Sequence, residues 1–170
     1  MPGLSQITIE DQDRDRLRIQ DKELMQMTDD GRCLTMHQPW ASLLVRGIKN
    51  LPSIDFFCSG MRNRHEGRSW YTSHRGRLWI HAAAKEPDPD VIAQMEQFYR
   101  SRAPDEQFDF PTEYPTSVLL GCVDVIDCLD RDSYLEQYPD GESDSDYVFI
   151  CENPQELLFK MPMRGLHKIC

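Results

Sequence analysis

The segment from Ser117 to Leu129 constrains the fold more than any other stretch of this 170-residue chain. A strand with one buried face alternates apolar and polar residues, but here both alternating sets of positions are largely apolar. Leu120 and Ile126 belong to one set, and Leu119 and Val123 belong to the other. The segment is therefore predicted to be a strand covered on both sides, as in a closed or nearly closed barrel with a helix packed outside.

Shorter apolar runs predict the remaining strands. One spans Cys33–Met36, and a buried one spans Arg77–Ala83. Two more are expected at residues 147–151 and 156–160, on either side of a turn at Asn153-Pro154. These strands do not alternate regularly with helices, which favours a mixed α+β fold over a parallel α/β sheet.

Two helices have clear start or stop signals. In the first, Pro39 suits the opening position, Trp40 lies on the apolar face, and Gly47 is placed to end the helix in the left-handed conformation. This arrangement puts Lys49 on the turn just beyond the helix. The second helix is predicted to begin after Asp88, which acts as its N-cap.

Acidic residues gather in residues 10–30 and 130–146, and both segments are interpreted as solvent-exposed tails or loops. Because the first also contains basic residues and has a poor helical stripe, residues 1–30 are predicted to be an acidic, mixed-charge linker or a short helix. The ordered domain is then residues 31–170. Three prolines predict an irregular path for residues 101–115.

The net charge of −10 repels a polyanion at long range, so nucleic acid would have to meet a local cationic surface. Such a surface is predicted between Arg46 and Arg77. This segment holds seven of the nineteen basic residues and only two acidic ones, Asp55 and Glu66. All three tryptophans lie between residues 40 and 79, so large aromatic rings accompany the cations.

The rest of the composition bears on location. No apolar run approaches the roughly 20 residues that cross a bilayer, and the first residues lack the pattern of a signal peptide. Six cysteines, none in a C-x-x-C pair, are typical of reduced thiols. A protein of the nucleus and cytosol, without a membrane partner, is expected.

Three motifs together resemble the ASCH domain, whose hallmark is G-x-K-x-x-E-x-R. They are His37-Gln38-Pro39-Trp40-Ala41, Gly47-x-Lys49 and Glu66-x-Arg68-Ser69-Trp70. The resemblance covers about residues 32–168 and is closest to the ASCH domains of transcriptional coactivators. The chain departs from the family in one place, because fourteen extra residues, 50–63, stand between the lysine and the glutamate.

The resemblance implies a PUA-like β-barrel of about five to six strands with two or more flanking helices. It also implies a coactivator domain that binds DNA and/or RNA in a basic cleft, mainly through backbone phosphates and base stacking. The further partners it implies are nuclear receptors and subunits of a helicase-containing cointegrator complex, reached through the full-length protein. No cofactor, metal or catalytic residue is assigned.

Physical chemistry makes such a site plausible. Lys49 on its turn and Arg68 entering a strand can converge on one phosphate, while Glu66 pairs with one of these cations and fixes its direction. Exposed aromatic rings offer faces to unstacked bases. The candidate nucleic-acid-binding residues are Lys49, Arg68, Glu66, Gly47, Ser69, Trp70, Tyr71, His37, Trp40, Arg62, Arg64, His74, Arg75 and Arg77.

Structural roles compete with this interpretation. Trp40 sits in an apolar pattern typical of a core residue, and Lys49 with Arg68 could form a salt bridge that only supports the barrel. His37 either caps the following helix or lies in the cleft. A zinc site would draw on the region's histidines and a cysteine, but their spacing matches no known ligand pattern. The residues concerned are His65, His74, His81 and Cys58.

Two other functions remain open. Some small bacterial relatives with this barrel are amidohydrolases that act on N-acylated cytidine, and Lys49 with Glu66 could supply a base and an acid. The inserted loop is expected to disturb that geometry, so the chain is not expected to be an enzyme. The second alternative is a protein-interaction module without nucleic-acid binding, which would use residues 130–146 or the aromatic Ile54–Phe57 stretch.

Overall fold

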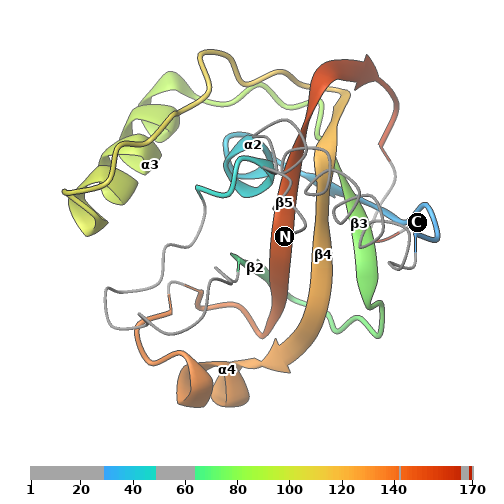
Figure 1. Cartoon of the computed structure of the whole chain (residues 1–170), viewed down its shortest axis with the longest axis vertical. Coiled ribbons are helices and arrows are strands. Elements are labelled where there is room, and N and C mark those ends of the chain that lie inside the picture. Colours follow the sequence, from blue (N-terminus) through green and yellow to red (C-terminus); the bar gives the residue numbers. More distant parts are fainter. Residues whose placement is uncertain (1–28, 49–63, 142, 166–168, 170) are drawn as a thin grey trace, which may run out of the picture.

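The computed structural model describes residues 29–48, 64–141, 143–165 and 169. Within them, one mixed sheet of five strands is accompanied by three helices (Figure 1). The elements in chain order are β1 (Cys33–Met36), α2 (Trp40–Val45), β2 (Arg64–Arg68), β3 (Gly76–Ala82), α3 (Pro89–Arg102), β4 (Val118–Asp130), α4 (Arg131–Gln137) and β5 (Tyr147–Pro162). None of the described helices is long and apolar enough to span a membrane.

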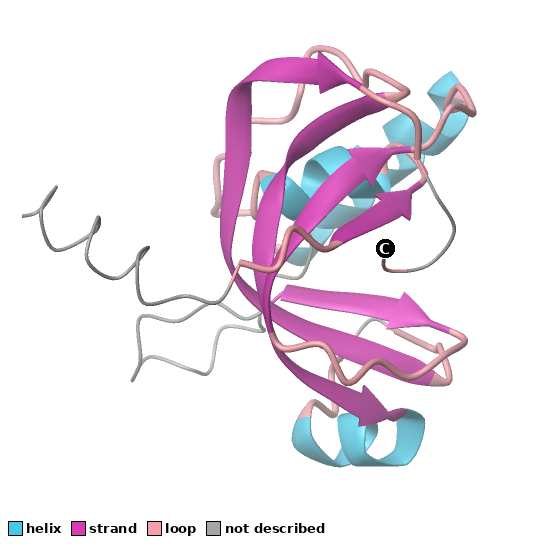
Figure 2. Cartoon of the chain, turned by 90° about the vertical axis from the view of Figure 1, so that its right-hand side faces the viewer, coloured by secondary structure: helices cyan, strands magenta, loops and turns pink. Residues whose placement is uncertain are grey.

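The strand order is β1-β3-β4-β5-β2, with β1 parallel to β3 and every other pair antiparallel. The long strands β4 and β5 form the middle of the sheet. β3 pairs with the first part of β4, from Val118 to Val125, whereas β2 pairs with the first part of β5, from Tyr147 to Cys151. Because β4 and β5 are antiparallel, β3 and β2 are attached at opposite ends of this central pair (Figure 2).

The sheet bends strongly but stays open. Its register shifts at three places between β4 and β5, and such irregularities increase the local bend and twist of a sheet. The edge strands β1 and β2 do not pair with each other, so the predicted closed barrel is corrected to an open, curved sheet in the described residues. At the β1 edge, Leu34 makes an isolated antiparallel bridge with Ile169 near the end of the chain. The α+β class and the number of strands are as predicted, although β2 was not predicted as a strand.

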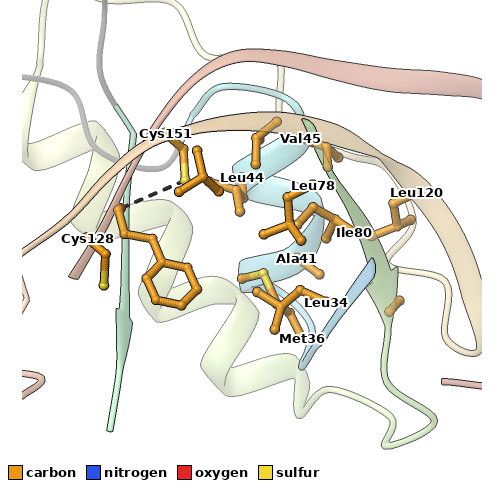
Figure 3. Close-up of a cluster of buried hydrophobic side chains, with 14 residues drawn as sticks. Leu34, Met36, Ala41, Leu44, Val45, Leu78, Ile80, Leu120, Cys128 and Cys151 are labelled. Atoms are coloured by element: carbon orange, nitrogen blue, oxygen red, sulfur yellow. Dashed lines mark hydrogen bonds between the residues drawn. The ribbon is translucent and has the colours of Figure 1, made fainter. Parts of the chain in front are cut away.

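The main core fills the concave side of the sheet. α2 contributes Ala41, Leu44 and Val45, which meet side chains of β1 and β3 beneath the arch of β4 and β5 (Figure 3). Leu120 and Phe149 complete the cluster from the central strands. Apolar residues of β4 are thus covered, as the sequence predicts, although Ile126 is partly exposed.

The short helix α2 ends as predicted. The Gly47 amide donates to the carbonyl of Leu44, and the Ile48 amide donates to that of Leu43, at 3.0 and 2.9 Å. This pair of hydrogen bonds is a Schellman motif, which needs a left-handed residue, and Gly47 has a φ of 71°. The N-cap Pro39 makes no side-chain capping bond.

The longer helix α3 packs on a second, smaller cluster. Tyr99 is its buried residue, and it joins Leu43 of α2 and Ile48. Phe108 and Phe110, from the irregular segment after the helix, pack against the same cluster. The predicted start is confirmed, because the Asp88 carboxylate accepts from the amide of Asp90 at 2.9 Å.

Two predictions about the C-terminal third were wrong. Residues 130–146 are not all loop, because α4 begins after Asp130, whose side chain accepts from the Ser133 amide, and it buries Tyr134 in a third cluster. The two strands expected around Asn153-Pro154 are one strand, β5. Asn153 takes a left-handed φ of 48°, which makes the strand irregular at this point without ending it.

Candidate nucleic-acid interface

The edge strand β2 carries the E-x-R part of the predicted site. Successive side chains of a strand alternate between faces, so Glu66 and Arg68 lie on the same face. Glu66 Oε1 lies 3.0 Å from Arg68 Nη2, and only 7% of the glutamate side chain and 22% of the arginine side chain are exposed. β2 is held in place by β5, with Glu66 opposite Phe149 and Arg68 opposite Tyr147.

The guanidinium of Arg68 keeps unused donors. Nε and Nη2 are buried, and neither makes a hydrogen bond of good geometry with any atom in the described part of the chain. The contact with Glu66 is therefore a close ion pair rather than an aligned fork. A buried donor without a partner costs free energy. Because Nε and Nη2 are buried, an anionic ligand would approach this guanidinium through the 22% of the side chain that is exposed.

The aromatic residues after β2 divide into a core residue and an exposed one. Trp70 packs edge-on against Phe149 with ring centroids 5.3 Å apart, and it lies against the main core. Tyr71 is 55% exposed and contacts Tyr147 edge-on at 5.9 Å. Ser69 is exposed beside them. Tyr71 is thus the ring in this segment with a face available to a base.

The basic residues around the start of β3 have carboxylate or carbonyl partners. Arg75 pairs with Asp127 at 3.1 Å. Arg77 lies 3.9 Å from each of two carboxylates, Asp124 and Asp29. His74 is half-buried, and its Nε2 lies 2.8 Å from the Arg77 carbonyl oxygen. The positive charge that the sequence concentrates here is largely offset, and no described contact joins these residues to Arg68.

Asp124 is a buried carboxyl on β4 next to Arg77. Burial raises its pKa, and this effect outweighs the hydrogen bond from Asn153 and the charge of Arg77, which both act in the opposite direction. The Asn153 amide donates to Asp124 Oδ2 at 3.0 Å. This group holds β3, β4 and the bend of β5 together. Asp29, expected in a linker, also belongs here, because it accepts from Trp79 Nε1 at 3.2 Å.

The residues before and within α2 have mixed roles. His37 is exposed, and it contributes its backbone carbonyl, which accepts from the Ala41 amide. Its side chain does not cap the helix. That capping contact comes from Gln38, whose side-chain oxygen accepts from the Ser42 amide at 3.1 Å. Trp40 is half-buried against the main core, as the structural interpretation predicts.

A hollow of about 440 Å³ opens beside the C-terminal end of α2, where Gly47 and Ile48 form part of its wall. Arg46 spans this wall, with its Nε 2.7 Å from Glu156 Oε2. Lys160 approaches the other oxygen of the same carboxylate, also at 2.7 Å. Sequence reasoning missed this network, because nothing near Arg46 in the chain marks a partner on β5.

Three predicted residues cannot be placed. Lys49 and Arg62 lie outside the described residues, and so does the 50–63 insertion. Arg64 is described in its backbone only, which pairs with Cys151. The predicted convergence of Lys49 with Arg68 therefore stays a prediction. Among the described residues, no group of three or more His, Cys, Asp or Glu side chains could hold a metal ion.

Comparison with known families settles the relationship of the chain. The model of the ASCH domain matches residues 62–160, which include β2 through most of β5. The chain belongs to the ASCH domain family. The match covers the Glu66–Arg68 pair, the charged group around Asp124 and both long strands.

Two curated relatives are named Activating signal cointegrator 1, one from Homo sapiens and one from Mus musculus. Each is 52% identical to this ASCH domain over 156 residues, which is 91% of the chain and 24% of the relative. The chain therefore spans about a quarter of the length of these relatives. A solved ASCH structure from Zymomonas mobilis has a TM-score of 0.38 and 12% identity, covering 77% of this chain and 72% of that one.

Proposed function

We propose that this ASCH domain is the nucleic-acid-binding domain of a transcriptional coactivator and contacts DNA and/or RNA mainly through backbone phosphates. The relatives named as a signal cointegrator support the coactivator part of the proposal. The observation that carries the binding part is Arg68, a guanidinium that is 22% exposed at its side chain and whose Nε and Nη2 have no hydrogen-bond partner in the described chain. The domain acts as a binding module and not as an enzyme.

A phosphate suits the chemistry of Arg68. A guanidinium presents N–H groups in a planar fork that matches two phosphate oxygens, and charge-assisted hydrogen bonds are about twice as strong as neutral ones. Glu66 lies 3.0 Å from Nη2 of this guanidinium, limits its movement and offsets part of its charge. The contact is thus directed, and it recognises the backbone rather than a base sequence.

Tyr71 supplies the second kind of contact. Its ring is exposed three residues beyond Arg68 in the sequence. Stacking of a base on an aromatic ring is tolerant of sequence, because every base has a flat face. Arg68 and Tyr71 fit a single strand with weak sequence preference, and contacts from Lys49 and Arg62 stay predictions.

The cellular setting is part of the same proposal. We place the domain in a protein of the nucleus and cytosol that works with nuclear receptors and cointegrator-complex subunits through its full length. The domain then brings that assembly to nucleic acid. The net charge of −10 limits adventitious binding, because it repels polyanions that do not reach the local site.

The test is a titration of the chain with labelled single- and double-stranded DNA and RNA at several salt concentrations. With about three to five phosphates neutralised on a single strand, log K against log salt should have a slope between roughly −2 and −3.5. Lys49→Ala should weaken binding by about 1–3 kcal/mol, and Arg68→Lys, which keeps the charge but loses the fork, by about 1 kcal/mol. Glu66→Gln should matter less to the ligand.

Two matched variants serve as controls. Lys85→Ala and Arg100→Lys make the same chemical changes at exposed positions and should bind as the wild type does. Absence of binding to every nucleic acid at low salt would contradict the proposal and favour the protein-interaction alternative. Hydrolysis of an N-acylated cytidine that is lost in both Lys49→Ala and Glu66→Gln would establish the amidohydrolase alternative instead.

A further inference from the structure

The last part of β5 exposes an unusual amount of apolar surface. Leu158 is 94% exposed and Phe159 is 86% exposed, and Met161 and Met163 are also exposed. These four residues are called the apolar knuckle here. Single exposed apolar residues are normal on a protein, but several large ones within six residues of one strand point to an interaction site.

The shape of β5 explains why the side chains of Leu158 and Phe159 are both exposed. Neighbouring side chains of a strand point to opposite faces, so high exposure of Leu158 and Phe159 means that neither face is covered there. In the pairing with β4, Gly121 lies opposite Glu156 but Leu119 lies opposite Met161. β5 therefore has extra residues between these points and arches away from β4 (Figure 2).

The arch is braced from within. The Lys160 ammonium contacts both the Glu156 carboxylate, at 2.7 Å, and the carbonyl oxygen of Leu157, which closes the base of the arch. Beyond it, the Met163 amide donates to the carbonyl of Ser117 at 3.0 Å. The knuckle is thus a fixed projection with hydrogen bonds on both sides.

The charge around the knuckle differs from that of the whole protein. The chain carries a net charge of −10, yet residues 157–170 contain no Asp or Glu. Arg164, next to Met163, is exposed and makes no ion pair with the described residues. Lys160 is paired with Glu156, so Arg164 is the described charge beside the knuckle without such a partner, and an acidic segment is the one that complements it.

We propose that the apolar knuckle is a docking site for a peptide segment that combines acidic residues with Leu or Phe side chains. Such acidic, hydrophobic segments are typical of disordered activation domains, and methionines give a binding surface the ability to fit varied side chains. A nucleic acid fits less well, because it requires several cations and stacking faces, whereas three of the four knuckle residues are aliphatic or thioether side chains.

The experiment uses three labelled synthetic peptides of equal length and the 170-residue chain. The first peptide alternates Asp or Glu with Leu and Phe, the second replaces the apolar residues with Ser, and the third replaces the acidic residues with Lys. The first should bind, and the other two should bind at least about tenfold more weakly. Each of Phe159→Ser and Leu158→Ser should lower the affinity about tenfold or more, because burial of one such side chain shifts an equilibrium constant by at least that factor.

Leu135→Ser is the matched control, since Leu135 is a partly exposed leucine on α4, outside the knuckle. It should leave the affinity unchanged, and Arg164→Glu should lower it several-fold. Thermal unfolding of the knuckle variants should match the wild type, because their side chains pack against nothing.

The proposal is overturned if no peptide binds, if the lysine peptide binds as tightly as the acidic one, or if the knuckle variants bind like the wild type. It is also overturned if sedimentation shows that the knuckle joins two copies of the chain. A loss of nucleic-acid affinity in Phe159→Ser without peptide binding would assign the knuckle to the nucleic-acid surface instead.

Discussion

Replacing Glu66 with glutamine tests the ion pair on which the direction of Arg68 depends. The change preserves shape and removes a negative charge 3.0 Å from Arg68 Nη2. With only 22% of its side chain exposed, Arg68 cannot recover full hydration. Removing one partner of a fully buried pair costs about 3–5 kcal/mol, and the partial exposure here reduces the expected loss to about 2 kcal/mol.

A double-mutant cycle separates this pair energy from the effects of each side chain. Arg68→Met should also cost about 2 kcal/mol, because Glu66, whose side chain is only 7% exposed, loses the positive charge of Arg68 beside it. The double variant, with both charges removed, should lose about 2 kcal/mol rather than the sum of about 4 kcal/mol, which gives a coupling energy of about 2 kcal/mol.

Urea unfolding followed by tryptophan fluorescence measures these differences, and Trp70 is a suitable reporter because its ring packs on Phe149 beside β2. In a chain of this size each single variant should melt about 4–8 °C below the wild type. If the double variant loses the sum of the two single losses to within about 0.5 kcal/mol, the two side chains are not coupled and the reasoning is refuted.

Three further predictions concern other parts of the chain. Gly121→Val should lower the free energy of unfolding by about 3 kcal/mol, since any side chain there runs into the backbone of Gln155, and an unchanged urea midpoint would contradict this. Burial, with help from Glu96, raises the pKa of the Tyr114 hydroxyl above its ordinary value of 10.0, so with rising pH this tyrosine ionises in the unfolded state before it does in the folded state. The free energy of unfolding should therefore fall above pH 10.0 more steeply in the wild type than in Tyr114→Phe. Parallel stability profiles of the two proteins would contradict this. Deletion of residues 50–63 should change the melting temperature only slightly, because closing a longer surface loop costs only about 0.6 kcal/mol per doubling of length, and failure of the shortened chain to fold would place the insertion in the core.

Local signals predicted most of the helices and strands. Gly47 and Asp88 act within one turn of the helix ends that they fix, and they behave as their residue types imply. α4 was missed because Asp130 was counted as one acidic residue among many, although a carboxylate before a short amphipathic stretch is also an N-cap signal. At Asn153 the sequence signal for a turn does not distinguish a reversal of the chain from a bend in a continuous strand.

The site was predictable to the extent that its residues lie close together in the chain. Glu66 was predicted to pair with Lys49 or Arg68, and in the structure it pairs with Arg68, two residues along the same strand. The carboxylates that offset Arg75 and Arg77 lie on β4, about 50 residues away, so charge counting over a single segment overestimated the free positive charge. Whether the sheet closes likewise depends on its total curvature, to which three register shifts contribute. No single residue in the sequence signals that total.

The position of β2 in the sheet has a consequence for protein synthesis. β2 pairs only with β5 among the described strands, and β5 follows it by about 80 residues. At a synthesis rate of roughly 5–20 residues per second, the nascent chain carries Glu66 and Arg68 for roughly 4–16 s before their strand has a partner. The guanidinium of Arg68 acquires its final surroundings only when β5 has been made, so an incomplete chain lacks the assembled Glu66–Arg68 pair to which we assign the proposed phosphate contact.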